Sequence, residues 1–287
     1  MNIECLWQVG AQVGESPLWV PSENALYFVD IYGDVLHRYH PESGEKRSQP
    51  ATARLSALVP LKSGGFLGSA QHSVGKVDVT TGKLDSWATL SNEPATNRLN
   101  DGKCSPQGFY YTGSMDDTKQ RSSGSLYLMD GSRTLRAIDS GYTITNGPAF
   151  SPDGRVMYHA DTTGHVLYRF AVESDGTLTG KLAFLHFTAE TGRPDGMTTD
   201  TDGGLWVAHA AGSCIKRYSP EGKVLQVIQL PVTKVTSMAF GGADYRTLFI
   251  TSACIGLSTQ ELQAQPLAGA LFATVPGVQG LPAAAYG

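Results

Sequence analysis

The chain has 287 residues, 41% hydrophobic and 17% charged, and its 22 basic and 26 acidic residues give a net charge of −4. Without a run of Lys or Arg, this balance argues against binding to nucleic acid or to an anionic membrane. No stretch approaches the ~20 apolar residues of a membrane span, and residues 1–10 lack the pattern of a signal peptide. Cys5, Cys104, Cys214 and Cys254 show no CxxC spacing, as expected for reduced thiols in a cytoplasmic protein.

A short apolar run recurs six times along the chain, in each case beside a turn rich in Gly, Pro, Asp or Asn. Successive runs begin between 40 and 49 residues apart, close to the ~40–50 residue period of four-stranded propeller blades. The runs are residues 26–29, 66–67, 109–111, 156–158, 205–207 and 248–250. The repeat predicts an all-β fold, a six-bladed β-propeller with four-stranded blades that comprises residues 1–287 as a single domain.

Each run is followed by a further short strand-like segment that ends in a turn. In chain order these segments are residues 35–40, 75–79, 125–129, 165–170, 213–218 and 270–275. The sixth repeat is one strand short at its C-terminal end, whereas an apolar segment at residues 3–9 precedes the first repeat. We therefore expect the N-terminal strand to complete the last blade and close the ring, which removes exposed strand edges.

The register of the repeat also predicts where a site would lie, because the innermost strands of a propeller surround its central channel. Counting back from each apolar run gives one residue near the start of each innermost strand. These residues are Glu15, Ser56, Asn100, Asn146, Asp195 and Thr236. All six carry a side-chain oxygen, two are carboxylates, and none is Lys, Arg or His. Such oxygens suit a hard or borderline divalent cation, although a polar channel that holds only water would have the same composition.

Several motifs in these regions resemble those of a known family. They are GESPLW at residues 14–19, NRLNDGK at 97–103, YTGSM at 111–115, TNGPAFSPDG at 145–154, PDGM at 194–197 and FGG at 240–242. In order and spacing they are similar to the regucalcin, gluconolactonase and luciferin-regenerating-enzyme family. The resemblance implies a propeller sugar lactonase with one divalent metal, either Ca, Zn, Mn, Mg or Fe(II). It also implies that Glu15, Asn146 and Asp195 hold the metal and that Arg98 and Asn100 contact the substrate.

One motif departs from the family pattern. After the GSM motif some relatives carry a Glu that approaches the substrate, whereas residues 116–119 read Asp-Asp-Thr-Lys here. Whether Asp116 or Asp117 contacts the substrate therefore stays open. The GPAFSPDG and GSLY motifs resemble those of bacterial aldonolactonases more than those of animal regucalcins. This resemblance implies a lactone such as glucono-, galactono-, xylono- or arabinonolactone.

The chemistry that the resemblance implies is direct hydrolysis of the lactone to the free aldonic acid by water. A bound cation polarises the carbonyl and eases deprotonation of a metal-bound water. Asp195 is then expected to act as general base, and Arg98 to stabilise the developing negative charge. No GxSxG elbow supports a covalent route. We expect a small-molecule sugar lactone as the only partner, in a monomer or weak homo-oligomer. The alternatives are a non-catalytic propeller that binds proteins, or a related propeller esterase or calcium-binding protein.

Overall fold

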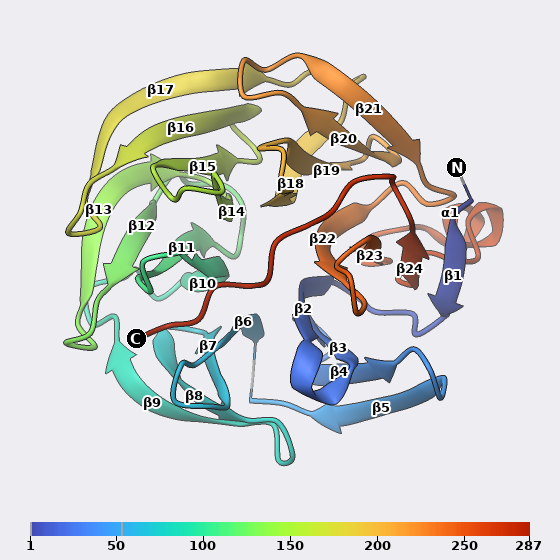
Figure 1. Ribbon diagram of the computed structural model, residues 1–287, viewed down its shortest axis with the longest axis horizontal. Coiled ribbons are helices and arrows are strands. Elements are labelled where there is room, and N and C mark those ends of the chain that lie inside the picture. The colour runs from blue at the N-terminus through green and yellow to red at the C-terminus, as the bar shows by residue number, and fades with distance from the viewer. Residues whose placement is uncertain (1, 53) are drawn as a thin grey trace.

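The computed structural model describes residues 2–52 and 54–287, and these residues form six four-stranded sheets arranged as a ring (Figure 1). Neighbouring strands within each sheet are antiparallel and follow the chain order in five of the sheets. In the remaining sheet the N-terminal strand β1 (Glu4–Trp7) pairs with β24 (Leu271–Thr274), the last strand of the chain. The six-bladed β-propeller and its closure by the N-terminal strand are therefore confirmed.

Each blade has its innermost strand at the channel and its outermost strand at the rim of the ring. From the channel outward, the first blade contains β2 (Gly14–Val20), β3 (Ala25–Asp30), β4 (Val35–His40) and β5 (Glu45–Pro50). The second blade contains β6 (Leu55–Pro60), β7 (Phe66–Ala70), β8 (Ser73–Asp78) and β9 (Lys83–Thr89). The third blade contains β10 (Asn97–Cys104), β11 (Tyr110–Asp116), β12 (Gly124–Met129) and β13 (Leu135–Tyr142). The fourth blade contains β14 (Thr145–Phe150), β15 (Val156–Asp161), β16 (Val166–Val172) and β17 (Leu178–His186). The fifth blade contains β18 (Arg193–Thr199), β19 (Leu205–Ala210), β20 (Cys214–Tyr218) and β21 (Val224–Gln229). The sixth blade contains β22 (Val235–Gly241), β23 (Thr247–Ser252), β24 and β1. A 3-10 turn (Pro21–Glu23) and helix α1 (Thr259–Ala264) lie between strands, and no described helix is long and apolar enough to cross a membrane.

The predicted apolar runs lie in the second strand of each blade, and the packing explains why these runs are continuous. In β3, Leu26 and Phe28 pack against the sixth blade, whereas Tyr27 and Val29 pack against the second. Successive residues of a strand face opposite sides of the sheet, and a blade is covered on both sides by its neighbours. Burial of each such side chain contributes roughly 1.5–3 kcal/mol. The described apolar side chains form six clusters of this kind, each shared by two adjacent blades.

The C-terminal segment, residues 275–287, crosses the middle of the ring (Figure 1). Its backbone forms bridges from Gly280 to Asp200 and from Tyr286 to Leu61. Asp200 and Leu61 directly follow the ends of β18 and β6. The segment therefore covers the end of the channel at which the innermost strands finish.

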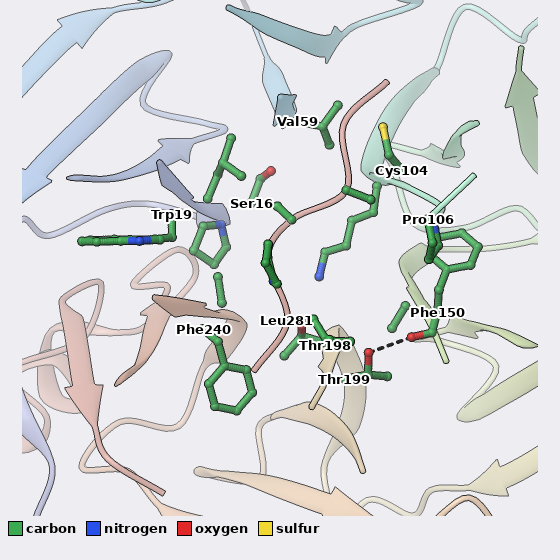
Figure 2. Close-up of a pocket in the computed structure, with 18 of the residues that line it drawn as sticks. Ser16, Trp19, Val59, Cys104, Pro106, Phe150, Thr198, Thr199, Phe240 and Leu281 are labelled. Carbon is green, nitrogen blue, oxygen red and sulfur yellow. Dashed lines mark hydrogen bonds between the residues drawn. The ribbon is translucent and has the colours of Figure 1, made fainter. Parts of the chain in front are cut away.

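A cavity of about 120 Å³ lies beneath this segment (Figure 2). Its walls come from the second halves of the innermost strands, for example Trp19, Phe150 and Phe240, and its cover includes Leu281. The residues predicted to form a site lie near the starts of the same strands. The candidate site is therefore at the opposite end of the channel from this cavity.

Candidate functional site

The entrance to β2, which carries Glu15, is held by the end of the neighbouring strand. Asp30, the last residue of β3, accepts hydrogen bonds from the backbone N–H groups of Gln12 at 2.8 Å and Val13 at 2.9 Å. Glu15 follows two residues later and is buried. Charge-assisted bonds of this kind are about twice as strong as neutral ones, so the backbone that presents Glu15 is well anchored.

The entrance to β14, which carries Asn146, repeats this arrangement. Asp161, the last residue of β15, accepts hydrogen bonds from the N–H groups of Thr143 at 3.2 Å and Ile144 at 3.3 Å. Asn146 again follows two residues after the second contact. The same local device therefore positions two of the three predicted metal ligands.

The third predicted ligand, Asp195, lies in β18, where the packing is closer. His209 at the end of β19 is 2.6 Å from the carbonyl oxygen of Thr191, which fixes the segment leading into β18. A Cβ atom on Gly196 would lie 2.2 Å from Oγ of Ser237 in β22. Only glycine fits directly after Asp195, because any side chain there would force the two innermost strands apart.

Hydrogen bonds donated by side chains join three blades at this end of the channel. Nδ2 of Asn100 lies 3.2 Å from Oδ1 of Asn146, whose own Nδ2 donates to Oγ1 of Thr162 at 2.7 Å. Oγ1 of Thr162 in turn donates to the carbonyl oxygen of Pro194 at 2.7 Å, next to Asp195. Two predicted ligands and one predicted substrate residue are therefore brought together.

Three carboxyl groups, Glu15, Asp101 and Asp195, are gathered in the channel and influence one another. Burial, with the charges of Asp195 and Asp101, raises the pKa of Glu15 well above its usual range. Burial and the charge of Asp101 raise the pKa of Asp195 to about 8. Burial likewise raises the pKa of Asp101 to about 6. The cluster carries more negative charge than its surroundings stabilise, and a cation would relieve this repulsion.

Two members of this cluster were not predicted as functional from the sequence. One carboxylate oxygen of Asp101 accepts a hydrogen bond from Gly102 N–H at 2.8 Å. Its second oxygen, however, accepts one from Gly147 N–H at 3.0 Å and so links β10 to β14. Lys103 donates from Nζ to the carbonyl oxygen of Met197, and the charges of Asp101 and Glu15 act on it. Lys103 therefore supplies a basic side chain at this site, whereas none of the six predicted ring residues is Lys, Arg or His.

The remaining members of the predicted ring are Ser56 and Thr236, and their hydroxyl groups donate hydrogen bonds to backbone carbonyl groups. Oγ of Ser56 donates to the carbonyl oxygen of Ser69 at 3.2 Å. Oγ1 of Thr236 donates to the carbonyl oxygen of Gly14. These contacts connect strands, so neither hydroxyl is free to hold a ligand through its proton.

Arg98 is almost fully buried, and the protein fixes most of its guanidinium. Nε donates to Oδ1 of Asp117 at 2.7 Å, and Nη1 donates to the carbonyl oxygen of Leu99 at 3.0 Å and to Oδ1 of Asn100 at 2.7 Å. Tyr32 lies against the guanidinium, 5.5 Å from ring centre to Cζ, and donates to the same Asp117 oxygen at 2.6 Å. Nη2 donates to no described residue.

The two aspartates after the GSM motif have different surroundings. Asp116 accepts hydrogen bonds from the Thr118 hydroxyl at 2.6 Å and from the N–H groups of Gln120 and Arg121, all in its own turn. Asp117 instead contacts Arg98. Of the two, Asp117 is the carboxylate that belongs to the candidate site.

The side-chain oxygens of Glu15, Asn146 and Asp195 are donor atoms of the kind that a hard cation takes. Among the described residues no three His, Cys, Asp or Glu side chains form a ready-made metal site, but the predicted set contains only two such residues beside the amide of Asn146. Glu15 accepts a hydrogen bond from Ser16 N–H through Oε2 at 2.9 Å, and Asp195 accepts one from Gly196 N–H through Oδ1 at 3.1 Å. The other oxygen of each carboxylate accepts none from a described residue, which leaves one oxygen on each for a cation.

The chain is similar to known proteins over almost its whole length. Residues 13–254 match the SMP-30/gluconolactonase/LRE-like region. A 6-deoxy-6-sulfogluconolactonase from Pseudomonas putida is 34% identical, with 97% of this chain and 96% of the relative covered. Regucalcin from Danio rerio is also 34% identical, with 100% and 98% covered. A crystal structure of a calcium-binding protein, regucalcin from Agrobacterium tumefaciens, superposes with a TM-score of 0.93 at 28% identity, covering 99% of this chain and 96% of that one.

The fold is a six-bladed β-propeller, and the matching family model and the lactonase among the relatives place the protein with enzymes of the lactonase type. The chain belongs to the SMP-30/gluconolactonase/LRE-like family, as the motifs from GESPLW to FGG predicted. This membership supports an enzyme over the non-catalytic propeller that the sequence also allowed.

Proposed function

We propose that the protein hydrolyses the lactone of a sugar acid to the free aldonic acid with the help of one divalent cation held by Glu15, Asn146 and Asp195. The observation that carries the proposal is the group of three carboxyls at one channel mouth, the buried Glu15 and Asp101 and the half-buried Asp195, with Lys103 as the nearby cation. The lactonase named among the relatives supports a sugar lactone as the substrate class. A bound cation would supply a Lewis acid that draws electron density from the lactone carbonyl.

Asp195 is the residue proposed to move the proton. A carboxyl group with a pKa of about 8 is mostly protonated at neutral pH. It can accept a proton only after a bound cation has displaced the proton that it carries. Once ionised, Asp195 takes a proton from water through the carboxylate oxygen that does not contact the cation, as the water oxygen attacks the carbonyl carbon. The bond between that carbon and the ring oxygen then breaks, and the proton passes to the departing oxygen. The products are one carboxylic acid and one hydroxyl group.

Arg98 and Asn100 are proposed to orient the substrate. Nη2 of Arg98 can donate to an oxygen on which negative charge develops, and its fixed guanidinium needs little reorganisation. Nδ2 of Asn100 already donates to the Thr145 carbonyl oxygen at 2.6 Å and to Asn146. Asn100 therefore has no N–H left for a sugar hydroxyl, and its contribution is to hold Arg98 and Asn146 and to accept one further hydrogen bond through Oδ1.

The test is a panel of aldonolactones assayed with chelator-treated protein before and after addition of Ca, Zn, Mn, Mg or Fe(II). We expect hydrolysis to stop on chelation and to return with at least one of these metals. Hydrolysis that survives complete metal removal would contradict the metal, and no hydrolysis of any lactone with any metal would contradict the activity.

A further inference from the structure

The first two blades contact the candidate site through two side chains that the sequence did not single out, Tyr32 and Arg54. Tyr32 lies in the turn after β3, and Arg54 directly precedes β6. The end of β3 pairs with the start of β2, and β6 begins at the same channel mouth. Arg98 lies in β10 of the third blade, so contacts between these residues and Arg98 cross the boundaries between blades.

Side chains from these three blades converge on the carboxylate of Asp117. Its Oδ1 accepts hydrogen bonds from the Tyr32 hydroxyl at 2.6 Å and from Nε of Arg98 at 2.7 Å. Its Oδ2 lies 3.8 Å from Nη1 of Arg54. One carboxylate therefore holds a phenol and two guanidinium groups together.

The ring of Tyr32 connects the two arginines a second time. Its centre lies 4.3 Å from Cζ of Arg54 and 5.5 Å from Cζ of Arg98. Both distances are within the ~6 Å over which an aromatic ring attracts a cation. Nη1 of Arg54 is buried and has no hydrogen-bond partner among the described residues. The ring of Tyr32 and the charge of Asp117 therefore hold this part of the Arg54 guanidinium in place.

The backbone fixes Arg54 against the turn that carries Tyr32. Asp34, in that turn, accepts a hydrogen bond from the Arg54 N–H at 2.7 Å. The carbonyl oxygen of Asp34 also accepts one from the N–H of Ala51 at 2.8 Å. Arg54 has a φ of 58°, in the left-handed region that residues other than glycine adopt rarely. The fold therefore holds Arg54 over Tyr32 through the backbone as well as through the side chain.

We propose that Tyr32 and Arg54 are positioning residues that act on Arg98 through Asp117. This inference rests on the proposed role of Arg98 in lactone hydrolysis and adds residues of two other blades to it. Nη1 of Arg98 is already bound to Leu99 and Asn100, so the network around Asp117 fixes the Nε side of the guanidinium. A guanidinium that is held on both sides needs little reorganisation when charge develops in the transition state.

Tyr32→Phe tests the first of these residues, because it removes one hydroxyl and keeps the ring. We expect kcat/KM for the best aldonolactone to fall about fivefold, mainly through kcat, since the lost orientation matters most in the transition state. Tyr27→Phe is the matched control. The Tyr27 hydroxyl also donates to a carboxylate, that of Glu23 at 2.7 Å, but at the opposite end of the first blade. Equal kinetics for Tyr32→Phe and wild type would overturn the role of Tyr32.

Arg54→Asn tests the second residue, because asparagine suits the left-handed backbone and removes the guanidinium. We expect kcat/KM to fall about threefold. Arg133→Asn is the matched control, since Arg133 also has a positive φ, of 62°, and its Cζ lies 3.8 Å from the ring centre of Trp87. Arg133 is exposed in the turn after β12, away from the candidate site. Equal kinetics for Arg54→Asn and Arg133→Asn would overturn the role of Arg54.

A double-mutant cycle shows whether both residues act through Arg98. In an Arg98→Lys background, Tyr32→Phe and Arg54→Asn should each change kcat/KM by less than about twofold. Effects as large as those in the wild-type background would show that the two residues act independently of Arg98, which would overturn the inference.

A measurement on Arg98 itself does not depend on turnover. Heteronuclear NMR follows hydrogen exchange at its Nε, and the signal is assigned by its loss in Arg98→Lys. We expect exchange about tenfold faster in Tyr32→Phe and in Arg54→Asn, and unchanged in the two control variants. Unchanged exchange in both test variants would overturn the inference. Faster exchange in a protein that hydrolyses no lactone would support the positioning of Arg98 and contradict only the proposed reaction.

Discussion

Nε of Arg98 donates to Oδ1 of Asp117 over 2.7 Å, and this contact joins a buried guanidinium from β10 to the loop that follows β11. The same carboxylate oxygen accepts the Tyr32 hydroxyl at 2.6 Å. Asp117 therefore fixes the orientation of Arg98, whose Nη2 donates to no described residue. Of the two aspartates that follow the GSM motif, Asp117 is the one that contacts Arg98.

Arg98→Lys should not be a conservative change. A lysine ammonium cannot reproduce the planar group that contacts Asp117 and Asn100 while one nitrogen stays free. We expect kcat/KM to fall by roughly 10²–10³ while metal affinity stays near that of the wild type. Steady-state kinetics and calorimetric metal titration measure the two quantities. Activity within a few-fold of wild type would remove Arg98 from the site.

Asp117→Ala should have a smaller effect of the same kind. Arg98 keeps its bonds to Leu99 and Asn100 but loses its fixed orientation, so we expect kcat/KM to fall about tenfold. Asp244→Asn, at an aspartate whose side chain is 65% exposed, serves as the control. Equal kinetics for the two variants would show that Asp117 does not act through Arg98.

Asp195→Asn separates metal binding from proton transfer. Asparagine keeps an oxygen ligand and the size of the side chain but loses the basic oxygen. Turnover should fall by roughly 10²–10⁴ while metal still binds, perceptibly weaker, in a calorimetric titration. Near-normal turnover with metal bound would exclude Asp195 as the base.

The ring of blades and its closure follow from the sequence because each second strand is buried on both faces and must be continuously apolar, as Leu26 to Val29 show. The roles of Asp101 and Lys103 do not follow. Strict alternation would place Asn100 and Asp101 on opposite faces, but the register of β10 shifts between Leu99 and Gly102. Both side chains then reach the channel. Such a bulge has no signature in hydrophobic periodicity, and the C-terminal crossing likewise has no repeat that could have revealed it.

His159 should make the protein sensitive to acid. It is fully buried beside Tyr142, neither ring nitrogen has a partner among the described residues, and burial lowers its pKa to about 3. Its usual pKa is 6.5. Between these values the unfolded chain binds a proton that the folded protein does not, so its contribution to stability is lost as pH falls from about 6.5 toward 3.

His159→Phe keeps a buried ring and removes that proton. The difference in Tm between variant and wild type should grow in favour of the variant as pH falls from 7 to 4.5, as thermal denaturation would show. His186→Phe, at an exposed histidine that ends β17, should show no such trend. A difference in Tm between His159→Phe and wild type that does not change with pH would show that protonation of His159 does not destabilise the folded protein.

Lys103→Met should change metal binding and metal-free stability in opposite directions. Lys103 lies near Glu15 and Asp101 yet forms no ion pair with them within the described structure, so its ammonium acts on the cluster through space. Without this ammonium group a divalent cation in the site is not repelled by a neighbouring positive charge. The affinity for the cation should therefore rise roughly ten- to a hundredfold by Coulomb's law in a partly screened site. The chelated protein should lose stability at neutral pH, because three acids then share a site without a cation.

Calorimetric titration with calcium and with manganese, and Tm with and without chelator, measure both effects. Lys62→Met removes an exposed lysine beside the C-terminal segment and should change neither. A residue needed only for packing would weaken metal binding and stability together when replaced. Reduced or unchanged metal affinity in Lys103→Met would therefore show that the ammonium does not balance the carboxylates, whereas tighter binding by a less stable apo-protein is the combination that charge compensation requires.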